Sequence, residues 1–117
     1  MHEMGIAIEI VKIATDSIPA NLKNPKVARI NLKVGKLASV VPVSLKFCFE
    51  VAAKDTSMEG ALLHIEEIEV TVRCKSCGHF WTAMTPTFIC EKCDGGSVDL
   101  LSGRELDIVS IEVEEEA

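Results

Sequence analysis

The 117-residue sequence contains no apolar run that approaches the ~20 residues needed to cross a bilayer. Its first residues, Met1-His2-Glu3-Met4, also lack the basic flank and the apolar stretch of a secretory signal peptide. We therefore expect a cytoplasmic protein with no membrane partner. In that reducing compartment its five cysteines are expected to be thiols or metal ligands and not disulfides.

The sequence also lacks the motifs of common enzyme classes, because no nucleophile–base pair, phosphate-binding glycine loop or catalytic zinc pattern is present. There are no internal repeats of solenoid period, and only the acidic end, Glu114-Glu115-Glu116-Ala117, reads as a solvated tail. The net charge of −6 argues against general nucleic-acid binding, which needs a basic surface. We therefore expect a protein that is not an enzyme and has no nucleic-acid partner.

Acidic residues are absent between Asp16 and Glu50, whereas six basic residues fall in that interval. This segment is interpreted either as a solvated basic face or as a docking surface for an acidic partner. The six residues are Lys23, Lys26, Arg29, Lys33, Lys36 and Lys46.

Hydrophobic residues make up 48% of the chain, which is enough for one compact core and a small satellite. Residues 4–18 carry apolar residues at helical spacing, and Pro19 is expected to end this helix. A second helix is expected to begin near Pro42, because proline is favoured in a first turn. The expected apolar positions are Ile6, Ile10, Ile13, Ala14 and Ile18 in the first helix and Leu45, Cys48, Phe49 and Ala52 in the second.

Residues 27–34 alternate between apolar and polar, which predicts a strand with one buried face. Segments 62–72 and 106–113 also alternate, but their phase flips at Glu66-Glu67 and at Val109-Ser110. Such a flip requires a bulge, a bend or a change of sheet. We expect these two strands to pair with each other and to bend where one subdomain becomes another.

These patterns predict an α+β fold in which two helices pack on a small, mostly antiparallel sheet of about three strands, near residues 27–34, 62–70 and 104–113. A four-cysteine, zinc-ribbon-like subdomain is inserted into it. The expected α/β domain comprises residues 1–70 and 104–117, and the expected zinc-binding insert comprises residues 71–103.

Four of the five cysteines form two CxxC turns, Cys74–Cys77 and Cys90–Cys93, with twelve residues between them. Zinc favours four soft ligands at tetrahedral corners, and two such turns complete that sphere. A site closed in this way is structural, because catalysis needs an open coordination position. An iron–sulfur or rubredoxin-type iron site uses the same ligands and is the alternative.

The segment 74–103 is too short to bury a core of its own, so its folding is expected to need the metal. Phe80, Trp81 and Phe88 either pack around the metal loop or stack on bases, and the near neutrality of residues 74–94 favours packing.

Three further side chains are assigned simpler roles. His79 lies close to Cys77 and is expected to support a metal ligand or to sense pH near the metal. His64 is expected on the surface, and Cys48 is expected to be a small buried hydrophobe.

The N-terminus reads Met1-His2-Glu3. The Met1 amine, the His2 amide nitrogen and the His2 imidazole can close adjacent rings on one metal, and planar nitrogen donors suit Ni(II) or Cu(II) better than zinc. Glu3 can add a carboxylate or a hydrogen bond to a ligand. The alternative is a mobile terminus with no function, although these residues lead directly into the helix expected at 4–18.

Three elements together resemble the HypA/HybF nickel-insertion proteins, and the resemblance covers essentially the whole chain. They are the Met1-His2-Glu3 start, the two CxxC turns, and the closing Gly103-Arg104-Glu105-Leu106 with Ser110-Ile111-Glu112. The resemblance implies a cytoplasmic accessory factor for the maturation of NiFe-hydrogenases and, in some organisms, of urease. The implied partners are a HypB-type GTPase, the hydrogenase large subunit and, where urease is served, urease maturation factors.

The resemblance also implies the site residues. Ni(II) is held for transfer by His2 with the backbone nitrogens of Met1, His2 and Glu3, and Glu3 assists or docks the partner. Structural Zn(II) is held by Cys74, Cys77, Cys90 and Cys93. Some family members place a carboxylate in the loop before the second helix, but residues 38–44 contain none, so backbone donors are expected to contribute more.

Two other functions stay open from the sequence. One is a zinc-ribbon adaptor that binds protein or nucleic acid and does not use its N-terminus. The other is a redox protein with iron at the four cysteines. The chain is expected to be a monomer or a dimer, the latter through exchange of the bent strands.

Overall fold

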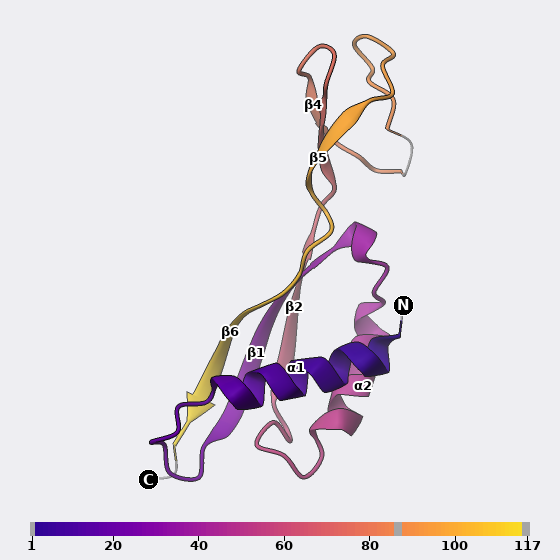
Figure 1. The fold of residues 1–117 in the computed structure, drawn as a ribbon. Helices are drawn as coiled ribbons and strands as arrows, with labels where there is room; N and C mark the ends of the chain where they lie inside the picture. The colour runs from indigo at the N-terminus through magenta and orange to yellow at the C-terminus, as the bar shows by residue number, and fades with distance from the viewer. Residues whose placement is uncertain (1, 86–87, 116–117) are drawn as a thin grey trace. The chain divides into compact units, whose positions relative to one another are not determined.

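The computed structural model describes residues 2–85 and 88–115. The chain forms α1 (Glu3–Ser17), β1 (Lys26–Gly35), the 3-10 helix η1 (Lys36–Ala38), α2 (Pro42–Ala53), β2 (Leu62–Ile68), β3 (Thr71–Cys74), β4 (Phe80–Thr82), β5 (Val98–Ser102) and β6 (Leu106–Glu114) (Figure 1). No helix in the described part is both long enough and apolar enough to span a membrane.

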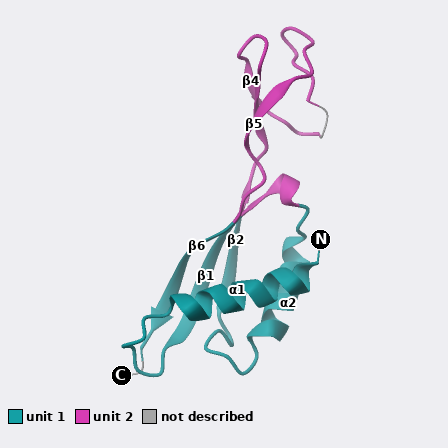
Figure 2. Cartoon of the chain, in the orientation of Figure 1, with its two compact units in different colours: residues 1–33, 39–66, 107–117 teal, residues 34–38, 67–106 magenta. Residues whose placement is uncertain are grey.

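The chain divides into two compact units (Figure 2). Unit 1 comprises the chain up to Lys33, Ser39–Glu66 and the chain from Asp107 onward. Unit 2 comprises Val34–Ala38 and Glu67–Leu106. Helices α1 and α2 lie in unit 1, and the four cysteines of the two CxxC turns lie in unit 2.

Helix α1 ends at Ser17, one residue before the end predicted from the sequence, because Pro19 cannot continue the hydrogen-bond ladder. Its buried residues are Ala7, Ile10 and Ala14, which recur at helical spacing. The expected core position Ile13 is wrong, because it falls outside this stripe and is 48% exposed.

Helix α2 begins at Pro42 as predicted and packs against α1. It buries Leu45, Phe49 and Ala53, which lie one turn apart on one face. Cys48 was expected to be fully buried, but it lies beside this stripe and is only half-buried.

The larger sheet has the strand order β2-β1-β6, so β1 is the central strand. The expectation that the two phase-flipped segments pair with each other is therefore wrong, since β2 and β6 occupy opposite edges. In the first of these segments the flip falls inside β2, where Glu66 and Glu67 are consecutive exposed residues between half-buried Ile65 and Ile68. Strand β2 ends at Ile68, and the chain enters the second sheet at Thr71, just after the unit boundary at Glu66/Glu67.

The flip in β6 is of the same kind. Val109 and Ser110 are consecutive exposed residues within one strand, between half-buried Ile108 and Ile111. It is a local irregularity and not a change of sheet.

The alternation predicted for β1 is confirmed, with Ile30 and Leu32 buried and a polar row on the opposite face. In that row Arg29 Nε donates to Asn31 Oδ1 (2.7 Å), and Asn31 Nδ2 donates to Ser110 Oγ (3.0 Å) and to Glu112 Oε2 (3.2 Å). These contacts match residues of β1 and β6 in antiparallel order. Arg29 also lies 3.6 Å from Glu112, so part of the basic segment is balanced by the chain's own carboxylates.

The second sheet has the order β4-β3-β5, with both neighbours antiparallel to β3. Val72 is buried and pairs with Trp81 on one side and Leu100 on the other. Arg73 faces Asp99 and bonds to it at 3.0 Å. Phe80 was expected to belong to a small core, but it is 59% exposed, because the short strand β4 turns it outward.

Two glycines in unit 2 allow two backbone segments to approach closely. Leu37 N–H donates to Gly103 O and Gly35 N–H donates to Glu105 O, both at 2.7 Å. A Cβ at Gly35 would overlap the carbonyl group of Gly103, and Gly103 itself has a φ of +121°. Only glycine fits both positions without a shift of backbone.

We predict that Gly35→Ala lowers the free energy of unfolding by about 3 kcal/mol or more, because backbone cannot rotate away as a side chain can. Urea denaturation followed by the fluorescence of Trp81 measures the change. Gly96→Ala is the control, since a Cβ there meets nothing within 4 Å. Equal stabilities of the two variants would contradict the packing described.

Candidate metal centres

The first cysteine turn is built at the end of β3. Cys74 is the last strand residue, and its N–H donates to His79 O (2.8 Å). Gly78 N–H donates back to Cys74 O (2.9 Å), and Gly78 takes the left-handed φ of +79° that this reversal requires. The turn thereby brings the side chains of Cys74 and Cys77 together.

The second cysteine turn repeats the same pattern. Cys90 N–H donates to Gly95 O (2.9 Å), and Asp94 N–H donates to Cys90 O (2.8 Å). Asp94 takes the place of the glycine with a φ of +59°, which aspartate tolerates better than most residues. Lys92 N–H also points at Cys90 Sγ (3.4 Å).

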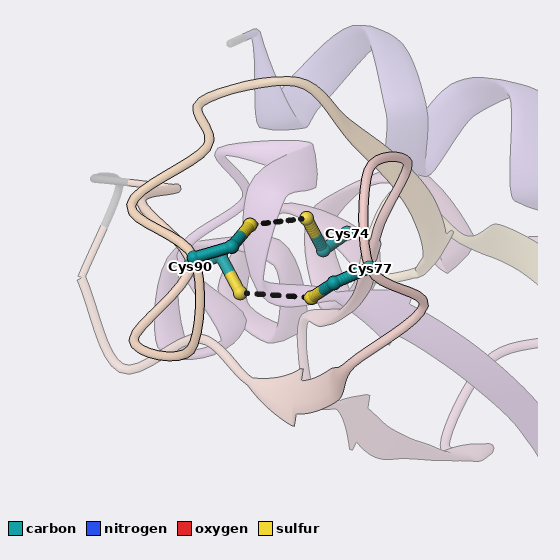
Figure 3. Close-up of side chains that lie close together, drawn as sticks. Cys74, Cys77 and Cys90 are labelled. Atoms are coloured by element: carbon teal, nitrogen blue, oxygen red, sulfur yellow. Dashed lines mark hydrogen bonds between the residues drawn. The ribbon is translucent and has the colours of Figure 1, made fainter.

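The two turns bring four sulfur atoms into one cluster. The Sγ atoms of Cys74, Cys77, Cys90 and Cys93 all lie within 4.8 Å of one another. The closest pairs join one turn to the other, with Cys74 to Cys93 and Cys77 to Cys90 both at 3.5 Å. Figure 3 shows Cys74 and Cys77 on one side and Cys90 facing them.

This arrangement fits a tetrahedral metal. Zinc–sulfur bonds of about 2.3 Å place the corners of a tetrahedron about 3.8 Å apart, within the range of separations seen here. Four thiol groups also match the preference of soft metals for sulfur. Cys74 and Cys90 are buried and the other two are exposed, so the cluster lies at the surface of unit 2.

The thiols of the cluster differ in acidity. A backbone hydrogen bond from Cys77 is the main cause that lowers the pKa of Cys74 to about 6. A backbone hydrogen bond from Gly95 lowers the pKa of Cys93, but the neighbouring sulfurs, Cys74 first among them, outweigh it and raise that pKa to about 12. One thiolate therefore forms readily, and its negative charge opposes ionisation of Cys93.

Sequence reasoning missed Gly95 as part of this site. A Cβ there would lie 3.2 Å from Cys93 Sγ and 3.6 Å from Cys74 Sγ, so a larger residue would press on two ligand atoms. The available signal was a glycine two residues after the second CxxC turn. His79, singled out from the sequence, contributes its backbone carbonyl to the first turn, and its ring stacks on Trp81 with centroids 5.6 Å apart.

The N-terminal residues lie in unit 1. His2 is exposed, has an extended backbone (φ −84°, ψ 93°) and occupies the N-cap of α1, where its side chain makes no capping hydrogen bond. Its imidazole is therefore not committed to the helix. Met1 lies outside the described residues.

Glu3 reaches the loop before α2. Its Oε2 accepts a hydrogen bond from Val41 N–H (3.2 Å). That bond, followed by one from Glu3's own N–H, holds the pKa of the Glu3 carboxyl below its usual value. The structure thus brings Glu3 to the loop in which the sequence offers no acidic residue. The third histidine, His64, is exposed on β2, as expected.

The fold and the cluster define a small α+β metal-binding protein with a closed set of four thiols. The chain belongs to the HypA family, since residues 1–113 match the family described as hydrogenase/urease nickel incorporation, metallochaperone, hypA. Proteins of this family are maturation factors and not enzymes.

Relatives agree along nearly the whole chain. A protein of Desulfosudis oleivorans named hydrogenase maturation factor HypA is 59% identical over 115 residues, covering 98% of this chain and 100% of the relative. A protein of the same name from Desulfatibacillum aliphaticivorans is 50% identical, with 97% and 87% covered.

The fold agrees with a solved structure. The solution structure of the nickel metallochaperone HypA from Helicobacter pylori has a TM-score of 0.68 and 23% identity, covering 99% of this chain and all of that one.

We predict that metal binding to the cysteine cluster weakens about 100-fold or more as the pH falls by one unit from about 7.5. A backbone hydrogen bond from His79 lowers the pKa of the Cys77 thiol, but the neighbouring sulfurs, Cys90 first among them, outweigh it and raise that pKa. The pKa of Cys93 is raised too. At least two protons must therefore leave when metal binds, and lower pH opposes their loss.

Zinc titration against a competing chelator at several pH values measures this slope. Cys48→Ser should leave it unchanged, because Cys48 is not part of the cluster. A slope of tenfold or less per pH unit would mean that only one thiol loses a proton.

Proposed function

We propose that this chain binds Ni(II) at its N-terminus and delivers it to a NiFe-hydrogenase during maturation, with zinc held at the cysteine cluster as a structural ion. The observation that carries the proposal is the match over residues 1–113 to a family of nickel-incorporation metallochaperones, which spans both segments proposed here to bind metal. The partners proposed are a HypB-type GTPase and the hydrogenase large subunit, in the cytoplasm. Delivery to urease maturation factors is a further proposed role, supported by the family's description.

Nickel is the cargo, and its donors are the Met1 amine, the His2 imidazole and the backbone nitrogens of residues 1–3. Support comes from the exposure of His2 and from its imidazole making no cap hydrogen bond. Nitrogen donors suit Ni(II), and an exposed site with few ligands can release its metal to an acceptor. Such a site suits transfer, whereas a buried and fully enclosed one would retain the ion.

Zinc is the resident ion, and Cys74, Cys77, Cys90 and Cys93 are proposed to hold it. Bound there, zinc would supply a closed four-sulfur centre that crosslinks two turns and has no open position for catalysis. The chain's own contribution is the pair of matching turns, which present the sulfurs and donate backbone N–H groups toward them. Pro86 and Thr87 in the connecting segment lie outside the described residues.

Substitution of His2 by alanine is predicted to weaken one nickel site by about 100-fold or more, because it removes the imidazole donor. Extension of the chain by one residue at its N-terminus should have a similar effect, because the amine is no longer adjacent to the chelate. Isothermal titration of zinc-loaded protein with Ni(II) measures both. His64→Ala is the matched control, since that exposed histidine lies on β2.

The same three variants also separate transfer from adventitious binding. The proposal fails if the His2 variant and the extended chain bind nickel as tightly as the parent. It also fails if the cell's hydrogenase is fully loaded with nickel when the extended chain replaces the parent.

Removal of zinc is predicted to unfold unit 2 while the helices of unit 1 persist. Among its described residues unit 2 buries few side chains, chiefly Val34, Val70, Val72, Cys74 and Cys90, so the metal is expected to supply much of its stability. Stripping with a thiol reagent and a chelator should shift the fluorescence of Trp81, the only tryptophan, to longer wavelength. The helical circular dichroism should change little, and returning zinc after thiol reduction should restore the emission. Unchanged emission would show that the metal is not structural.

A further inference from the structure

Helices α1 and α2 begin side by side in unit 1. Figure 1 shows the N-terminal end of α1 beside the start of α2, and the hydrogen bond from Val41 N–H to Glu3 Oε2 (3.2 Å) joins them. Val41 is the N-cap of α2, and Glu3 is the first residue of α1. One carboxylate therefore connects the first turns of two helices.

The start of α2 needs such a partner from elsewhere. Helices leave their first backbone N–H groups without acceptors, and a capping side chain usually fills that need. Here the N-cap is a valine, which has no acceptor, and the next residue, Pro42, has no N–H. Glu3 thus accepts a hydrogen bond from the N-cap N–H of a helix other than its own.

The start of α1 is equally short of a cap. His2 makes no side-chain cap hydrogen bond, and Ile6 N–H reaches His2 O at 3.2 Å as the first bond of the ladder. The Glu3 carboxylate lies at the positive ends of both helix dipoles, where a negative charge is favoured. It is therefore held on two sides, by its own helix and by α2.

We infer that Glu3 is a positioning residue for nickel transfer, whose carboxylate, held by Val41 N–H, fixes the backbone that follows His2 and is not itself a metal ligand. The inference rests on the proposed nickel site. A site made largely of backbone nitrogens is only as well ordered as the backbone that carries them. The hydrogen bond between Val41 N–H and the Glu3 carboxylate supplies that order. The loop before α2 has no acidic side chain, and it contributes this N–H donor instead.

Glutamine and alanine at position 3 separate positioning from ligation. Glu3→Gln keeps an oxygen that can accept from Val41 N–H, so its nickel affinity should stay within about threefold of the parent. Glu3→Ala removes the acceptor and should weaken nickel binding about tenfold or more. Titration of the zinc-loaded, full-length chain with Ni(II), with the visible spectrum recorded, measures both.

The donor is tested from the other side by Val41→Pro, which removes the N–H without changing any charge. It should weaken nickel binding as much as Glu3→Ala does, and the double variant should add little, because both remove one interaction. Val43→Ala is the matched control, since this side chain in the same turn is 78% exposed. If Val41→Pro folds poorly, the comparison of Glu3→Gln with Glu3→Ala still separates positioning from ligation.

Three results would overturn the inference. Equal losses in Glu3→Gln and Glu3→Ala, with a changed nickel spectrum, would make the carboxylate a ligand. Parent-like binding in Glu3→Ala would show that the tether does not serve the site, while leaving the proposed function intact. A parent chain that shows no nickel site dependent on His2 would refute the proposed function itself.

Discussion

The fold of unit 2 depends on the convergence of four sulfur atoms from two turns that twelve residues separate in sequence. Its apolar core is small, and β3 is the strand to which β4 and β5 both pair. A sheet of three short strands has little independent stability in water. A metal that binds four thiolates would close the loop between the turns and offset the cost of ordering it.

The matching turns explain how four sulfur atoms come to lie together. Each uses the same two backbone hydrogen bonds and one residue with positive φ, Gly78 in the first and Asp94 in the second. Backbone geometry therefore directs the sulfurs toward a common centre. The separation between the low pKa of Cys74 and the high pKa of Cys93 follows from packing thiols this closely.

Much of this structure was predictable from sequence, and the failures have physical causes. Pro42 and Pro19 marked helix boundaries correctly because proline acts locally. The CxxC spacing identified the cysteine cluster because each pair of cysteines is brought together by a local turn. Strand order was not predictable, because a phase flip marks an irregularity within a strand but does not show which strand lies beside it.

The roles of Gly95 and Val41 were also missed, and for a related reason. Both act through backbone or through the absence of a side chain, so nothing in their chemistry marks them. Gly95 matters because sulfur atoms lie where a Cβ would be, and Val41 matters because a carboxylate 38 residues earlier reaches its N–H. Only the folded chain brings these partners together.

The two proposed metal centres place opposite demands on their surroundings. A structural ion is best held by a complete set of ligands, which the four cysteines would supply from unit 2 alone. A transferred ion needs few ligands and an exposed position. The N-terminal backbone of such a site therefore has few contacts that hold it in one conformation. Ordering by contacts that do not touch the metal resolves the conflict, because they hold the backbone without adding a bond that must break at release. The Glu3 carboxylate, tied to the start of α2, is a contact of this kind.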